Sequence, residues 1–141
     1  MYTFKQLSLM CGLTERTLRN YLKMGILHGE KRRGVWYFDV SEVESFFENP
    51  FVSEAIKSSR KSIVFDHLKS NSRDKNRATV ILDLPEDKSM SVAAFFCDAV
   101  NRRTGLTMTF DRAGGANRVI LSGEEHTVVE ILDEYRAKKQ K

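Results

Sequence analysis

The sequence predicts an α+β fold in three successive parts, and three observations support it. Two short amphipathic helical patterns near the N-terminus are joined by a glycine-containing turn. A basic, glycine-bounded segment and a strand-like run follow them. Residues 78–141 then alternate between strand-like and helical patterns. We therefore expect a winged helix-turn-helix over residues 1–52, a connecting helix and linker over 53–77, and a small βαββα two-layer sandwich over 78–141.

Two helices are expected before residue 25. Thr3 is the candidate N-cap of the first helix, which should run to about Met10. Gly12 interrupts the helical pattern, Thr14 caps the second helix, and Gly25 ends it. Each helix has an apolar stripe on one face: Phe4, Leu7 and Met10 in the first, and Leu18, Tyr21 and Leu22 in the second.

A wing and a third helix are expected next. Residues 28–34 form a polar, basic tip, and residues 35–38 have strong strand preference. Two short strands around such a tip make a wing. The spacing Ser41-x-x-Glu44 predicts a capping box that opens the third helix, and Asn49-Pro50 should close it. The buried face of this helix should comprise Val43, Phe46 and Phe47.

The middle of the chain reads as a connecting helix followed by a linker. We expect a helix over residues 53–71, because Ile56, Ile63, Val64 and Leu68 share one face. Residues 70–76 are polar throughout and predict the linker.

The last part should contain three strands and two helices. Strands are expected over residues 79–84, 106–110 and 118–121, with the last two joined through the glycines at 114–115. A helix should start at Ser91 and end at Gly105. The spacing Ser122-x-x-Glu125 predicts a capping box for the final helix, whose apolar stripe is Val128, Ile131, Leu132 and Tyr135.

Composition argues against several classes of protein. The chain lacks both an apolar run of the ~20 residues that a membrane helix needs and a signal peptide, so we expect a cytoplasmic protein without membrane contact. Cys11 and Cys97 lie in apolar helical patterns and should be buried, reduced thiols. Residue spacing indicates no metal site and no nucleophile with an adjacent base. We expect no cofactor and no enzymatic activity.

Charge is distributed unevenly along the chain. Residues 1–77 carry 14 Lys and Arg against 9 Asp and Glu, whereas residues 78–141 carry 9 against 10. The whole chain has a formal net charge of +4. A basic front half favours an anionic partner there, although a chance excess on a solvated surface gives the same numbers.

The second helix has the residue types of a DNA reader. Arg16, Arg19 and Asn20 should lie together on the face opposite its apolar stripe, with Lys23 also off that stripe. Such side chains donate hydrogen bonds to phosphates and base edges. Lys31, Arg32 and Arg33 would supply a second contact from the wing. The candidate DNA-binding residues are Thr14, Arg16, Thr17, Arg19, Asn20, Tyr21, Lys23, Lys31, Arg32, Arg33 and Trp36.

Residues 2–47 resemble the DNA-binding domain of the MerR family and its excisionase-type relatives. The resemblance lies in the segments at residues 2–4, 12–14, 17–21, 25–27 and 38–43. It implies that Arg19 and Tyr21 help to hold the DNA backbone and that the wing makes further backbone contacts. Trp36 stands where the family usually has an arginine, and the family's long dimer helix and cysteine metal-sensing loop are not evident.

These observations predict a sequence-specific regulator that binds double-stranded DNA as a homodimer. Residues 78–141 would provide the dimer contact or, alternatively, a pocket for a small-molecule effector, and this segment suggests no family. An excisionase-type architectural factor is one alternative function. Another is a protein-interaction adaptor whose winged helix no longer binds DNA.

Overall fold

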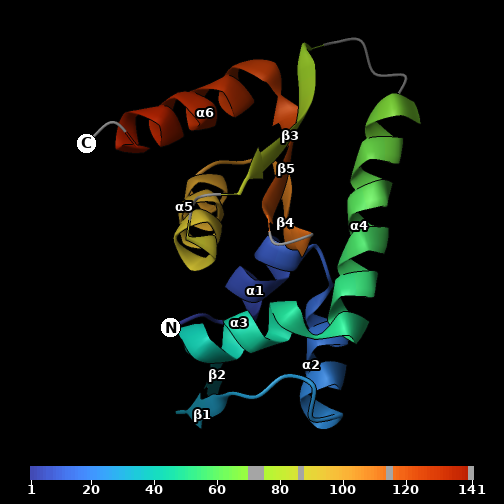
Figure 1. The fold of residues 1–141 in the computed structure, drawn as a ribbon, viewed down its shortest axis with the longest axis vertical. Coiled ribbons are helices and arrows are strands. Elements are labelled where there is room, and N and C mark those ends of the chain that lie inside the picture. Colours follow the sequence, from blue (N-terminus) through green and yellow to red (C-terminus); the bar gives the residue numbers. More distant parts are fainter. Residues whose placement is uncertain (70–74, 86–87, 114–115, 140–141) are drawn as a thin grey trace.

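The computed structural model describes residues 1–69, 75–85, 88–113 and 116–139. It confirms the predicted α+β class, with a helical N-terminal part below a three-stranded sheet in the view of Figure 1. In chain order the elements are α1 (Phe4–Cys11), α2 (Glu15–Lys23), β1 (Glu30–Arg32), β2 (Val35–Tyr37), α3 (Val40–Glu48), α4 (Pro50–Lys69), β3 (Arg77–Leu84), α5 (Ser89–Asn101), β4 (Thr107–Ala113), β5 (Ala116–Glu124) and α6 (Glu125–Lys139).

The first two helices begin where their caps predict. The Thr3 hydroxyl accepts the backbone N–H of Gln6, and the Gln6 side chain accepts the backbone N–H of Thr3, which completes a capping box. Thr14 caps α2 by accepting the N–H of Thr17 at 3.1 Å. Between the helices Gly12 has φ 73°, a left-handed conformation that strains a side-chain-bearing residue. The sequence therefore determines this tight turn locally.

The two capping boxes predicted for later helices, α3 and α6, are absent. Asp39, not Ser41, caps α3, because its carboxylate accepts the N–H of Glu42 at 2.9 Å. The pKa of Asp39 is lowered by that hydrogen bond and by another from the Ser41 hydroxyl. Ser122 does not cap α6: it is a buried residue of β5, and its hydroxyl bonds that of Thr79 at 2.8 Å. Both capping-box predictions were wrong.

Helix α4 begins earlier than expected and has a different buried face. It starts at Pro50, directly after α3, with the Asn49 side chain accepting the N–H groups of Phe51 and Val52. Ile56 is buried as predicted, whereas Leu68 is 78% exposed. The predicted linker lies mostly outside the described residues.

The sheet is antiparallel, in the order β3-β5-β4. Because side chains alternate between faces, Val119 and Leu121 of β5 lie on one face with Phe110 of β4. Helices α5 and α6 pack against the sheet on this side, where Phe96 and Ile131 complete the apolar layer. This arrangement matches the predicted two-layer sandwich.

Helix α4 covers part of the opposite face and is tied to it by polar contacts. The Arg60 guanidinium lies 2.7 Å from the Asp111 carboxylate, whose side chain is 1% exposed. Near the other end of the helix, His67 Nδ1 lies 2.7 Å from the Thr79 hydroxyl. These two contacts fix the direction in which α4 crosses the sheet, from β4 towards β3 (Figure 1).

The hydrophobic core runs without a break from the N-terminal helices into the sheet. Leu7, Met10 and Cys11 of α1 belong to the same buried cluster as the sheet residues, and α1 packs against both β4 and α5. The Phe47 ring of α3 meets Phe110 of β4 edge to face, at a centroid distance of 5.1 Å. The N-terminal part is therefore held rigidly against the sheet. The predicted boundaries at residues 52 and 77 remain predictions.

Candidate nucleic-acid interface

One face of α2 carries a compact set of hydrogen-bond donors. Leu18 and Tyr21 are buried and fix the orientation of the helix, while Arg16, Arg19 and Asn20 are exposed on the other side. Three- and four-residue spacing brings these donors together on one face. Lys23 is exposed in the last turn. The structure thus displays the donor face that the sequence predicts on α2.

Arg19 is held in place by an aromatic ring. Its guanidinium carbon lies 4.5 Å from the centroid of the Phe4 ring in α1, a cation–π geometry. Arg19 remains exposed, so the edge of the guanidinium is open to a ligand. Because stacking restricts the side chain before binding, less rotamer entropy is lost when a phosphate is bound. Sequence spacing did not reveal this contact, since fourteen residues separate the two positions.

The other predicted residues of α2 have mainly structural surroundings. The hydroxyls of Thr14 and Thr17 lie 3.0 Å apart at the start of the helix. Tyr21 is only 6% exposed, and its ring packs against Phe46 and Phe51. Burial raises the pKa of the Tyr21 hydroxyl. The DNA contact of Tyr21 remains a prediction, which this burial restricts to a small part of the side chain.

The wing is a β-hairpin whose two strands are joined by a two-residue turn. Strands β1 and β2 pair from Glu30 opposite Tyr37 to Arg32 opposite Val35. The connecting residues Arg33 and Gly34 have φ angles of 52° and 80°, and positive values at both positions are typical of a type I′ turn. Lys31 and Arg32 therefore lie in a strand rather than on the tip expected from the sequence. Arg33 alone of the three basic residues occupies the turn.

The basic residues of the wing are not equivalent. Arg32 donates to Glu30 at 2.9 Å, and this pair is exposed to solvent. The pair raises the pKa of Arg32 and lowers that of Glu30. Lys31 stands opposite Trp36, which is half-buried and packs against the core. The wing thus presents Lys31 and Arg33 as charges with no ion pair among the described residues, and Arg32 as a partly neutralised one.

The wing is also anchored to the N-terminus. Tyr2 and Phe38 exchange two backbone hydrogen bonds of 2.7 and 2.8 Å, and the Phe38 ring packs edge to face against Phe4. Phe4 thereby joins the wing to Arg19 through a single ring. A Cβ atom on Gly29 would meet the Phe38 ring at 2.5 Å, so this glycine permits the close approach. The donor face of α2 and the wing therefore form one rigid surface.

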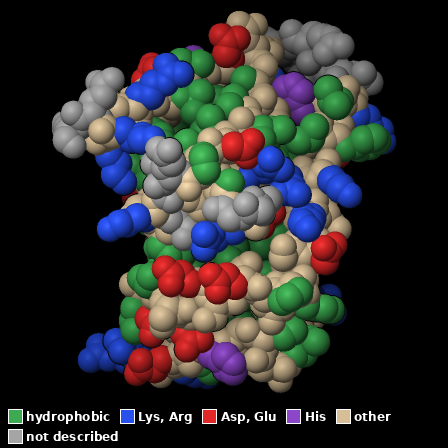
Figure 2. Space-filling model, viewed as in Figure 1, with side chains coloured by type: hydrophobic (Ala, Val, Ile, Leu, Met, Phe, Trp, Pro, Cys, Tyr) green, Lys and Arg blue, Asp and Glu red, His purple; other side chains and the backbone are tan. Residues whose placement is uncertain are grey.

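Acidic residues mark a different side of this region. Glu44 and Glu48 of α3 are exposed. In Figure 2 Asp and Glu side chains gather over the lower part of the molecule, where Figure 1 places α3 and, below it, the wing. A polyanion is repelled by such a surface. The duplex is therefore expected against α2 and the wing, away from α3.

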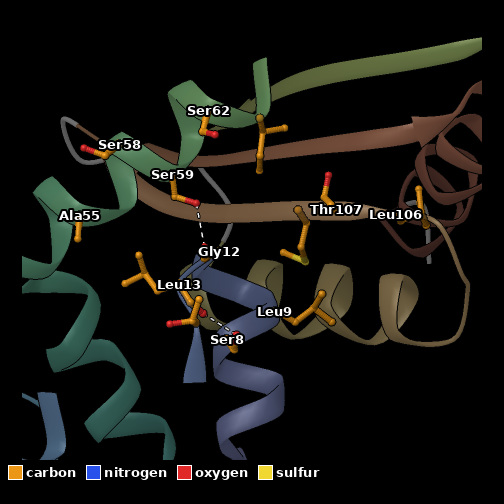
Figure 3. Close-up of a pocket in the computed structure, with 13 residues that line it drawn as sticks. Ser8, Leu9, Gly12, Leu13, Ala55, Ser58, Ser59, Ser62, Leu106 and Thr107 are labelled. Carbon is orange, nitrogen blue, oxygen red and sulfur yellow. Dashed lines mark hydrogen bonds between the residues drawn. The ribbon is translucent and has the colours of Figure 1, made fainter. Parts of the chain in front are cut away.

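A cavity of about 690 Å³ lies behind the turn that joins α1 to α2 (Figure 3). Its walls come from α1, α4 and β4. The Ser59 hydroxyl donates to the carbonyl of Gly12 at 3.0 Å, and the Ser8 hydroxyl donates to that of Leu13 at 2.5 Å. Four serines and two threonines contribute to the lining, which contains no ionisable side chain. The cap residue Thr14 is among them, so the cavity reaches the start of α2.

Residues 1–50 match the family model of a helix-turn-helix domain. The N-terminal part of the chain is a helix-turn-helix DNA-binding domain. The match includes α1, α2, the wing and α3, and it ends where α4 begins. No curated protein and no solved structure matches the chain.

The two cysteines, Cys11 of α1 and Cys97 of α5, are poorly suited to chemistry. Burial raises the pKa of Cys11 to about 12 and that of Cys97 to about 11, so both remain protonated at neutral pH. In the described part of the chain, no group of three or more His, Cys, Asp and Glu is placed to hold a metal ion. Among the described helices, none combines the length and apolar character of a membrane span.

Proposed function

We propose that the chain is a transcriptional regulator of MerR-like type, which reads double-stranded DNA with α2 and clamps the flanking backbone with the wing. The observation that carries this proposal is the rigid surface formed by Arg16, Arg19 and Asn20 on α2 together with Lys31 and Arg33 on the wing. Donors on a recognition helix contact base edges in the major groove, and wing cations contact phosphates. The protein acts in the cytoplasm by binding and performs no chemistry.

Two copies should act together. A single recognition helix reads only a few base pairs, and helix-turn-helix proteins gain affinity and specificity by placing two copies on half-sites one turn apart. The helix-turn-helix domain ends at α3, and α4 packs on its own sheet. We therefore assign the dimer contact to the part of the molecule beyond α3.

Salt-dependent binding of the full chain to a labelled duplex tests this function. Fluorescence anisotropy should show binding to random-sequence DNA at low salt, weakening as salt rises, because phosphate contacts release counterions. Absence of binding at low salt would contradict the proposal and favour the protein-interaction adaptor.

Genomic fragments selected by the purified protein would then supply specific sites for footprinting. One palindromic footprint supports a dimeric regulator, whereas a tandem array of footprints supports an excisionase-type architectural factor.

A second proposal is that a small-molecule effector regulates the protein, and the cavity behind the α1–α2 turn favours it. Its volume lies within the range of ligand sites. Its hydroxyl groups and apolar walls suit an uncharged ligand, because no side chain in the lining could neutralise a charge there. A ligand in this cavity would touch Thr14 and so bias the start of α2.

Thermal shift measurements with uncharged nucleosides and sugars test the effector site. A ligand should raise the Tm of the natural chain but not that of Ala55→Phe, in which a ring occupies part of the cavity. A panel with no effect on the natural chain, or an equal effect on both chains, counts against the site.

A further inference from the structure

Strand β3 is an edge strand whose outer side is available for pairing. Among the described residues it pairs with β5 alone, along its full length from Arg77 to Leu84. It contains no proline, glycine or lysine. Such an edge presents a row of backbone donors and acceptors to another strand. The other edge strand, β4, has α1 and α4 packed against it.

An apolar groove runs beside this edge. Phe65 and Leu68 of α4 are 61% and 78% exposed, and Ile81 of β3 is 52% exposed. Together with Val64 and Ile120 they form the apolar part of a groove of about 450 Å³, which Arg60, Lys61 and Arg118 also line. Figure 2 shows hydrophobic side chains over the upper part of this face, where Figure 1 places β3 between α4 and α6. Contiguous exposed apolar surface of this kind marks an interaction site.

The charges of β3 are complementary to the strand itself. Arg77 and Asp83 stand near opposite ends, and an antiparallel pairing centred on Val80 places each opposite the other in the second strand. Asp83 already pairs with Arg118 of its own sheet at 2.7 Å, and its side chain stays 52% exposed to a further cation. Thr79 then faces Ile81 of the second strand. All four side chains lie on the face that α4 covers, because they are separated by even numbers of residues. A strand that pairs with its own reverse in charge favours a second copy over an unrelated partner.

We propose that β3 pairs antiparallel with β3 of a second copy, so that the two sheets join into one of six strands. The two-fold axis is perpendicular to the sheet, passes midway between the two Val80 residues and keeps the faces of the two sheets aligned. Both α4 helices then lie on the same face, with their Phe65 and Leu68 side chains along the junction. This interface rests on the proposed function in so far as two copies are expected on DNA.

Cysteine cross-linking of the full chain tests the register. In Val80→Cys the two new thiols face one another across the axis, within the range of a disulfide. In Ile81→Cys the two new cysteines stand diagonally across the axis, about 7–8 Å apart, which is beyond that range. Cys11 and Cys97 are buried, with pKa values raised to about 12 and about 11, so the native thiols contribute little. We expect a covalent dimer from Val80→Cys and its near-complete loss in Ile81→Cys.

Sedimentation provides a test that does not depend on Val80, whose side chain packs against the core. The natural chain should be a dimer at micromolar concentration, and Leu68→Glu should be monomeric. Val129→Glu is the matched control, because Val129 is an exposed apolar residue of α6 away from the groove. A monomeric natural chain would overturn the proposal. A dimer that survives Leu68→Glu and fails to cross-link through Val80→Cys would do the same.

DNA binding separates this interface from the proposed function. A monomeric natural chain that still binds a duplex at low salt refutes the interface and leaves the function standing. A chain that dimerises and cross-links as expected but binds no duplex refutes the function and leaves the interface standing.

Discussion

At the scale of single residues, the contact between Arg60 and Asp111 joins the N-terminal and C-terminal parts of the molecule. Asp111 is 1% exposed, and its carboxylate is 2.7 Å from the Arg60 guanidinium. Its second oxygen is buried without a hydrogen bond. A buried carboxylate depends strongly on the cation that it directly contacts, because water cannot replace that partner.

Replacing Arg60 with methionine should therefore destabilise the protein by about 3–5 kcal/mol, the usual effect of breaking one side of a buried ion pair. Urea unfolding measures the change. Lys57→Met is the matched control, since Lys57 lies one turn earlier and its pair with Glu54 is exposed. That variant should lose less than about 1 kcal/mol. Equal losses of stability from the two substitutions would show that the Arg60–Asp111 pair contributes no more than the exposed Lys57–Glu54 pair.

Single residues also show where sequence patterns succeed. Thr3 and Thr14 were predicted as caps and are caps, because each is followed by a helix and preceded by a break. The same pattern at Ser122 misled, because β5 continues through that residue and α6 begins without a break at Glu125. Asp111 resembles a surface residue in the sequence, and only the position of α4 makes it a buried one.

At the scale of elements, the wing shows how an ion pair within one strand makes a basic side chain less available to a ligand. Glu30 and Arg32 are two residues apart in one strand, so their side chains share a face and meet. Strand periodicity therefore contains a signal for this pair, although the polar composition of the segment predicts a loop tip. A phosphate has to compete with Glu30 for Arg32.

Glu30→Gln should strengthen DNA binding, because it removes a competing carboxylate and a repulsive charge. The slope of log affinity against log salt should steepen by up to about one unit. Glu44→Gln, an equal charge change on α3, is the control and should have a smaller effect. Anisotropy titrations at several salt concentrations measure both. An unchanged slope in Glu30→Gln would mean that the wing does not approach the backbone.

The helices and strands themselves were largely predictable from sequence, whereas their packing was not. Hydrophobic periodicity located the helices and the three strands of the sheet to within a few residues, because each buries one face. It missed β1, whose residues are all exposed and lie in the predicted wing tip. The placement of α4 against the sheet depends on Arg60 and His67, which meet residues far away in sequence. The exposed face of Phe65 and Leu68 follows from that placement.

At the scale of the whole molecule, the continuous core implies that the helix-turn-helix domain and the sheet unfold together. Leu7 and Met10 of α1 are fully buried in a cluster that includes β4 and α5. Separating the two parts would expose these side chains to water. A cooperative unit of this kind would transmit changes at the sheet to α2.

Thermal unfolding should therefore be a single transition. The wing contains the one tryptophan of the chain, Trp36, so its fluorescence reports on the N-terminal part. Far-ultraviolet ellipticity reports on all helices. The two probes should give the same midpoint. A fluorescence midpoint at a temperature well below the ellipticity midpoint would show that the N-terminal part unfolds independently, which would contradict a shared core.

One charge reversal on the exposed face of α2 tests the proposed contact of this face with DNA. Arg19→Glu removes a predicted phosphate contact and adds repulsion while leaving the buried face of α2 intact. Arg136→Glu makes the same charge change at an exposed site on α6.

Affinity for a duplex at moderate salt should fall about tenfold or more in Arg19→Glu, with a salt slope lower by about one unit. The Arg136 variant should stay close to the natural chain. Equal affinities of the two variants, both folded by circular dichroism, would contradict the assignment of α2 as the recognition helix.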